Sequence, residues 1–351
     1  MNIETKTLSY RDNYIDIVKG LAVLAILFIH TVFWSGESYV PVYMQNIALL
    51  FDVPVFFLMT GCALSFTGIK EKFIPGQILK ISTTFTLVII LFQILFRNFD
   101  IKLIIDSVFL NQAIIPEFVV FGGSYWFVPV YVVSIIFASV IIKYKPNAIL
   151  GILVLCWLYY FLRFVNVTDV NTSFLGISLS GFFFYACLIL LGYKFYENKN
   201  NNKTFFWIFM IAIITLLIMQ YKTPNFRLQN YKFPLSYVYV SASMISVSAI
   251  LLLKNFGKKI IQRYPCPFLT YIGKNSIDFY LSQGISSSLL YKIIPLIQLP
   301  YGIKLCFAFI LNAIMAILIG FVLQKTLLFI PTVFKDIADK FVKLLKNIKT
   351  F

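Results

Sequence analysis

The chain has 351 residues, of which 60% are hydrophobic, 18% aromatic and only 13% charged. A mean hydropathy of +0.86 excludes a soluble globular protein, because too few polar side chains remain to face water. The net charge of +16 does not indicate nucleic-acid binding, since the Lys and Arg residues lie mainly between long apolar runs. The five cysteines predict neither a disulfide framework nor a metal site, because their number is odd and none forms a CxxC pair.

Long apolar runs recur along the whole chain, and they predict an all-α, polytopic membrane bundle without a soluble domain. Backbone groups in lipid must be hydrogen-bonded internally, so the runs are expected to be helices, and their continuous apolarity differs from the alternation of a membrane barrel. About ten runs approach the roughly 20 residues that cross a bilayer. The expected spans are 14–34, 47–67, 79–97, 125–143, 147–165, 173–193, 204–221, 235–254, 268–290 and 305–328.

The connections between these spans alternate in basic content. Lysine or arginine residues precede the first span and follow the second, fourth, sixth and eighth, whereas the other connections hold fewer. This alternation predicts that both termini face the cytoplasm. The loop 222–232 weakens the assignment, because it adds Lys222, Arg227 and Lys232 to the outer side.

Two segments depart from the pattern of spans. Residues 100–122 are only partly apolar, and two interpretations stay open: an interfacial or re-entrant piece, or an ordinary outer loop. Residues 333–351 space apolar side chains three or four apart among lysines, which predicts a basic amphipathic helix on the anionic inner leaflet. We therefore divide the chain into a transmembrane domain, 1–332, and a cytoplasmic tail, 333–351.

His30 is the only histidine of the chain, and it lies within the apolar run 21–33. An ionisable side chain at membrane depth is costly, so we interpret His30 as a functional residue; the alternative is a hydrogen bond between helices without chemistry. Lys19 precedes it by eleven positions. Helix geometry then places both on one face, about 20° apart around the axis and about 16 Å apart along it. The alternative for Lys19 is a lysine that extends to the membrane interface.

Asp52 is expected near the outer end of the second span, at the depth of His30. Neighbouring antiparallel helices would bring the two side chains together. We predict that Asp52 orients His30 or stabilises its protonated form, as an acid does in a catalytic triad. The alternative is that Asp52 faces the outer headgroups as a helix cap.

Four stretches of the chain, taken in order, carry a resemblance to a known family. The run RDNYIDIVKGLAVLAILFIH, residues 11–30, contains a basic residue, ten intervening residues and then histidine. The later stretches are DVPVFFLMTGCALSF (52–66), GGSYWFVPVYVV (122–133) and YIGKNSIDFYLSQG (271–284). Together they resemble the first span, the second span, the tryptophan-containing segment and the late segment of the membrane-bound acyltransferase 3 family.

The chain departs from the family pattern in three respects. The late segment often ends in Tyr-Leu-x-His, and Ser282 and Gln283 occupy that region here. Between the second and third spans, members often have arginines, whereas this chain has Lys70, Lys72 and Lys80, which lack the planar fork of arginine. The hydrolase-like soluble domain that some members append is not expected, so all transfer chemistry is expected within the membrane unit.

The resemblance implies O-acylation of a carbohydrate or lipid-linked glycan by an acyl-CoA donor, with acetyl-CoA as the default, in the bacterial cytoplasmic (inner) membrane. His30 is then the general base that removes the proton of a sugar hydroxyl, and Asp52 is its orienting residue. Lys19, Lys72 and Lys80 are the candidates for binding the CoA phosphates. No bound cofactor and no metal are expected.

Two further groups of polar residues are candidates for contact with the substrates. The first group is Ser124, Tyr125 and Trp126, which could donate hydrogen bonds to the developing oxyanion of the thioester; the alternative is an aromatic belt at the membrane interface. The second group is Lys274, Asn275 and Ser276, which could contact either substrate; the alternative is a turn at a helix start.

Three other functions fit a polytopic membrane protein with a protonatable histidine. A polysaccharide polymerase is expected to need basic residues in large outer loops, whereas the outer segment 98–124 contains only Lys102. A transporter or flippase would use His30 and Asp52 as a proton relay, but such proteins often show internal repeats, and none is evident here. The third alternative is a membrane sensor without enzymatic activity.

Overall fold

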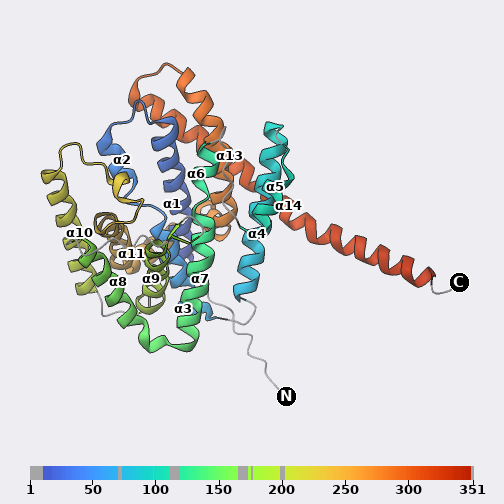
Figure 1. Cartoon of the computed structure of the whole chain (residues 1–351), viewed down its shortest axis with the longest axis horizontal. Coiled ribbons are helices and arrows are strands. Elements are labelled where there is room, and N and C mark those ends of the chain that lie inside the picture. Colours follow the sequence, from blue (N-terminus) through green and yellow to red (C-terminus); the bar gives the residue numbers. More distant parts are fainter. Residues whose placement is uncertain are drawn as a thin grey trace.

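The computed structural model describes residues 11–69, 73–97, 99–110, 119–164, 173–174, 177–197 and 202–348, and the described chain is almost entirely helical (Figure 1). Its first part contains α1 Asn13–His30, the π-helix η1 Thr31–Ser35, α2 Val42–Ala48, α3 Pro54–Thr67, α4 Phe73–Phe96, α5 Ile101–Val108, α6 Val119–Ser124, α7 Phe127–Tyr144, the 3₁₀ turn η3 Pro146–Ala148 and α8 Ile149–Phe164. Its second part contains a two-stranded antiparallel hairpin, β1 Ser173–Phe174 and β2 Ile177–Ser178, then α9 Leu179–Phe195, α10 Asn202–Lys222, η4 Leu228–Tyr231, α11 Tyr237–Arg263, α12 Pro267–Lys274, α13 Ser276–Ile293, η5 Ile294–Leu296 and α14 Tyr301–Ile348.

The lengths and apolarity of these helices confirm a multi-pass helical membrane protein. Within the described residues, six helices are long and apolar enough to cross a membrane: Asn13–Ser35, Phe73–Phe96, Val120–Tyr144, Asn202–Lys222, Tyr237–Arg263 and Tyr301–Leu328. Three shorter apolar helices accompany them: Pro54–Thr67, Pro146–Leu162 and Gly181–Phe195. The expected span 268–290 falls on α12 and α13, which meet at Asn275; α13 is polar for a span because it buries Asp278, Gln283 and four serines.

Helix α1 lies in the middle of the bundle, packed against α3, α11, α12, α13 and α14 (Figure 1). Asp12 caps its N-terminus by accepting a hydrogen bond from the backbone N–H of Tyr14 at 3.0 Å. On α12, a Cβ added to Gly273 would overlap the backbone carbonyl of Asp16. Glycine therefore permits close packing of α12 against the first turn of α1, and this contact places residues 274–276 near Lys19.

The expected span 47–67 is broken, which corrects the prediction of one continuous helix. Helix α2 ends at Ala48 and α3 begins only at Pro54, whose ring lacks a backbone N–H. In the turn between them, Asp52 Oδ1 accepts a hydrogen bond from the backbone N–H of Val53 at 2.6 Å. Asp52 is 3% exposed, so it lies inside the bundle rather than facing headgroups as a cap.

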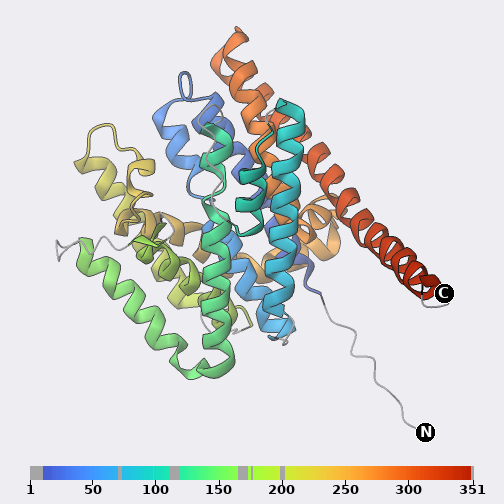
Figure 2. The same cartoon turned by 45° about the vertical axis from the view of Figure 1, so that its right-hand side comes forward.

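The segment 100–122 contains α5, which folds back along α4 (Figure 2). Ser82 Oγ donates to the carbonyl of Val108 at 2.7 Å, and Gln93 Nε2 donates to the carbonyl of Asp100 at 2.8 Å. Helix α5 thus runs beside α4 in the opposite direction, an arrangement that favours an interfacial or re-entrant piece over an ordinary loop. Residues 111–118 lie outside the described part of the chain.

The basic tail is not a separate element. Helix α14 runs without interruption from Tyr301 to Ile348, and its last part extends away from the bundle (Figures 1 and 2). The expected amphipathic helix is therefore the continuation of the last span. Its placement on a membrane surface stays a prediction, as does the division of the chain at residue 332.

Candidate functional site

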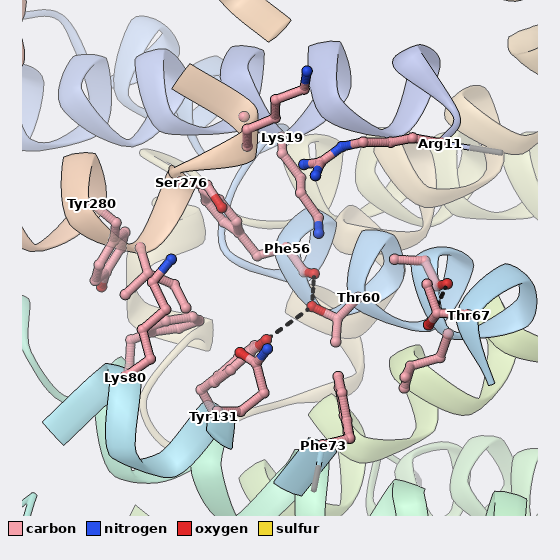
Figure 3. A pocket seen from close by; sticks show the side chains of 17 residues that line it. Arg11, Lys19, Phe56, Thr60, Thr67, Phe73, Lys80, Tyr131, Ser276 and Tyr280 are labelled. Carbon is pink, nitrogen blue, oxygen red and sulfur yellow. Dashed lines mark hydrogen bonds between the residues drawn. The ribbon is translucent and has the colours of Figure 1, made fainter. Parts of the chain in front are cut away.

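The candidate site consists of a cavity at one end of the bundle and of His30 further along α1. The cavity has a volume of about 220 Å³ and lies among α1, α3, α4, α7, α12 and α13 (Figure 3). We call it the basic cavity, because Figure 3 shows Arg11, Lys19 and Lys80 around it. Its polar lining consists of Arg11, Lys19, Thr60, Thr67, Gln77, Lys80, Tyr131, Lys274, Ser276 and Tyr280.

The basic cavity has an excess of positive charge. Four basic side chains line it, and no carboxylate does so among the described residues. Arg11 Nε donates a hydrogen bond to Asp16 Oδ2 at 2.7 Å, and this bond raises the pKa of the guanidinium. Lys80 Nζ lies 4.0 Å from Oδ2 of the buried Asp278 on α13. Lys19 and Lys274 form no ion pair with any residue that the structure describes. Such an arrangement suits a polyanionic ligand.

The imidazole of His30 is half-buried, and it accepts a hydrogen bond from Trp34, one turn later in η1. Trp34 Nε1 donates a hydrogen bond to His30 Nδ1 at 3.1 Å, and Ser124 Oγ lies 3.5 Å from the same nitrogen. Because Nδ1 accepts the indole hydrogen bond, the neutral imidazole has its proton on Nε2 and its lone pair on Nδ1. No described residue hydrogen-bonds Nε2.

A buried polar network holds the π-helix that follows His30. Asn312 Nδ2 donates to Thr31 Oγ1 at 3.1 Å, and its Oδ1 accepts from Ser286 Oγ at 2.6 Å. Thr31 Oγ1 in turn donates to the carbonyl of Leu27 at 2.8 Å. Segments of π-helix are rare and recur at functional sites. The network therefore fixes α1 against α13 and α14 at the depth of His30.

Tyr280 connects the basic cavity to His30. Its ring lines the cavity (Figure 3), and its hydroxyl donates to the carbonyl of Ser124 at 2.9 Å. The side chain of Ser124 lies beside His30, and its hydroxyl donates to the carbonyl of Val120 at 2.5 Å. A chain of contacts through Tyr280 and Ser124 thus joins the wall of the cavity to the imidazole.

The structure does not form the expected contact between Asp52 and His30. Asp52 Oδ2 instead accepts hydrogen bonds from Lys232 Nζ at 2.5 Å and from the Tyr239 hydroxyl at 2.6 Å. The Lys232 side chain is only 7% exposed, and its ammonium lies 5.5 Å from the ring centre of Trp126. Both oxygens of Asp52 thus accept hydrogen bonds from other residues, which corrects the expected orienting contact, whereas stabilisation of protonated His30 by Asp52 stays a prediction.

The oxyanion candidates differ in what they can still donate. The Tyr125 hydroxyl is fully buried and donates to the carbonyl of Leu281 at 2.7 Å, so it serves packing of α13. Ser124 already donates to a carbonyl, as described above. The Ser124 and Tyr125 hydroxyls both donate to carbonyls, whereas the indole N–H of Trp126 makes no hydrogen bond with a described residue.

The remaining predicted residues divide between the cavity and its surroundings. Lys19, Lys80, Lys274 and Ser276 line the basic cavity together, whereas the side chain of Asn275 donates to the carbonyl of Tyr271. The turn between α12 and α13 is therefore both a helix start and part of the cavity wall. Lys72 lies outside the described residues.

Sequence reasoning missed Trp34, Lys232 and Tyr280. Trp34 follows His30 by four positions, a spacing at which helical side chains meet, and this signal was present. Lys232 appeared only as an anomaly of the charge pattern. Its burial against Asp52 explains why a lysine occurs in a loop expected to be poor in basic residues.

We expect nitrogen NMR to show one tautomer of His30. In protein labelled at histidine nitrogens, the only histidine gives a single set of signals, and Nδ1 is expected to be the unprotonated nitrogen. Replacing Trp34 by phenylalanine removes the donor and should yield a mixture of tautomers. Phe28→Leu, an aromatic change on the preceding helix α1, serves as the control; an unchanged spectrum in Trp34→Phe would contradict the assignment.

Comparisons with known proteins add one finding. A family model described as an acyltransferase domain matches residues 12–325 of the 351-residue chain. No curated protein matches, and no solved structure matches. The matched range contains His30, Trp34, Tyr280, the Asp52–Lys232 pair and every residue that lines the basic cavity except Arg11.

Proposed function

Because the chain belongs to the acyltransferase 3 family, we propose that this membrane acyltransferase transfers an acetyl group from acetyl-CoA to a hydroxyl of a cell-surface or lipid-linked polysaccharide. The observation that carries the proposal is the connection, through Tyr280, between a positively charged cavity and the only histidine of the chain. The site thus combines His30, which is suited to acid–base chemistry, with a basic cavity that suits a polyanionic donor.

The basic cavity suits the donor. CoA is a polyanion, and Lys19, Lys80 and Lys274 offer ammonium groups to its phosphates. We add Lys72 to these CoA-binding lysines on the basis of the sequence alone. The helical rise from Lys19 to His30, about 16 Å, matches the order of length of an extended pantetheine arm. The end of the bundle that holds the cavity is then the cytoplasmic side of the bacterial inner membrane, with both termini in the cytoplasm.

His30 acts as the general base in this proposal. The acceptor hydroxyl replaces the Trp34 indole at Nδ1 and gives its proton to that nitrogen. The hydroxyl oxygen bonds to the thioester carbonyl carbon, and the indole N–H of Trp126 is the proposed donor to the oxyanion. Collapse of the intermediate breaks the carbon–sulfur bond, and the leaving CoA thiolate takes the proton from His30. The products are an acetyl ester and free CoA.

The competing transport function loses its main support. A proton relay through His30 and Asp52 needs the two groups in contact, and Asp52 is bound to Lys232 and Tyr239 instead. The acceptor is proposed to arrive from the outer side or from within the bilayer, opposite the donor.

Replacing Lys19 by methionine is expected to raise the KM for acetyl-CoA about tenfold, because one charge-assisted phosphate contact is lost. The kcat should change much less, since Lys19 lies far from the reacting atoms. Steady-state formation of labelled acetyl ester measures both constants. Lys143→Met, at an exposed lysine outside the cavity, is the matched control, and equal KM values in both variants would argue against the donor site.

A further inference from the structure

Gln283 on α13 differs from every other buried amide side chain that the structure describes. It is fully buried, and neither Oε1 nor Nε2 has a hydrogen-bond partner. The four other buried amides are all hydrogen-bonded: Gln45, Gln93, Asn312 and Gln324. A buried amide without partners is costly, and native proteins satisfy nearly all such groups. The unpaired donor and acceptor of Gln283 therefore point to a ligand.

Its neighbours on α13 place Gln283 between the basic cavity and His30. One turn before it, Tyr280 lines the cavity; one turn after it, Ser287 accepts a hydrogen bond from Asn312 Nδ2 at 3.1 Å. Asn312 also binds Thr31, the residue that follows His30. Residues three and four positions apart share a helix face. Gln283 thus lies on the course from the cavity to the imidazole.

A smaller space adjoins the basic cavity beside Tyr280. It has a volume of about 10 Å³, shares Tyr280 and Ile277 with the cavity, and reaches Leu281. Phe127, which packs against the Tyr280 ring, and Tyr131 also line both spaces. The walls are apolar apart from the two tyrosine side chains. Gln283 lines neither space; it lies on the next turn of α13, so an arm would have to pass Tyr280 to reach its amide.

We propose that Gln283 binds an amide group of the pantetheine arm of the acyl-CoA donor. This inference rests on the proposed function, in which the arm extends from the basic cavity to His30. Each pantetheine amide has one N–H and one C=O, and a glutamine side chain has the complementary acceptor and donor. Gln283 is then a binding residue that sets the reach of the thioester, and it takes no part in proton transfer.

The test compares two probes that differ by the phosphopantetheine arm, namely CoA and 3′,5′-ADP. Both are titrated into the purified full-length protein. Gln283→Met is expected to weaken CoA binding about tenfold and to leave 3′,5′-ADP binding unchanged, because only CoA loses hydrogen bonds. Lys19→Met, which acts on the phosphates, is expected to weaken both probes.

Controls separate binding from folding. Gln283→Met is expected to melt no lower than the wild type, since it removes an unpaired amide, whereas Gln93→Met, at an amide bonded to Asp100, is expected to melt lower yet to bind CoA normally. Unchanged CoA affinity in Gln283→Met, or equal losses for both probes, would overturn the inference. If the wild type binds neither probe, the proposed donor site itself is wrong.

Discussion

Replacing His30 by alanine is expected to lower the rate of acyl transfer by about 100- to 10,000-fold, the usual contribution of a general base. No other histidine in the chain can take its place. Its Nδ1 carries the lone pair, with Trp34 and Ser124 as its neighbours. The loss should appear in kcat, because His30 does not line the donor cavity.

Two controls accompany this variant. Leu21→Ala changes a side chain on the same helix that is 42% exposed, and it should retain wild-type rates. CoA affinity in His30→Ala should also stay at the wild-type value. A His30→Ala protein that transfers acyl groups at the normal rate would exclude the base role, whatever its affinity for CoA.

Replacing Lys232 by methionine is expected to destabilise the protein by about 3–5 kcal/mol, because it leaves the carboxylate of Asp52 buried without its cation. The two charges are 2.5 Å apart, and both side chains are almost entirely enclosed. Tyr239 alone remains as a side-chain donor to Asp52. Thermal unfolding in a fixed detergent measures the effect.

The double variant Lys232→Met, Asp52→Asn is the control for the loss of the ion pair. It removes both charges, so most of the lost stability should return. If Asp52 instead served mainly to orient His30, the double variant would regain stability and still lose activity. If Lys232→Met melts like the wild type, the buried ion pair described above is not formed.

Much of the fold was predictable because lipid permits few backbone arrangements. Long apolar runs must be helices, so their order follows from the sequence. Of the ten expected spans, six correspond to helices long and apolar enough to cross a membrane within the described residues. The same argument places Lys19 and His30 on one face of α1, and the structure places Lys19 on the basic cavity with Tyr280 between that cavity and His30. The break at Asp52 was missed, because hydropathy alone does not register a proline inside an apolar run. The turn at Asn275 was one of the two interpretations of residues 274–276, although the expected span 268–290 ran through it.

The partners of the predicted site residues were harder to foresee. Depth along a helix suggested that Asp52 meets His30, but depth does not say which way a side chain points. Lys232 comes from a loop 180 positions away, and no local pattern indicates such a contact. In the sequence, Gln283 is only a departure from the family pattern. The structure shows that its amide is buried without hydrogen-bond partners.

The most direct test of the account is transfer of radiolabelled acetyl from acetyl-CoA by the purified wild-type protein. The protein is reconstituted in vesicles and supplied with a polysaccharide or lipid-linked glycan that has free hydroxyls. We predict label in an alkali-labile acetyl ester on the glycan, with stoichiometric release of CoA. Uptake of glycan or protons without any ester would contradict the account.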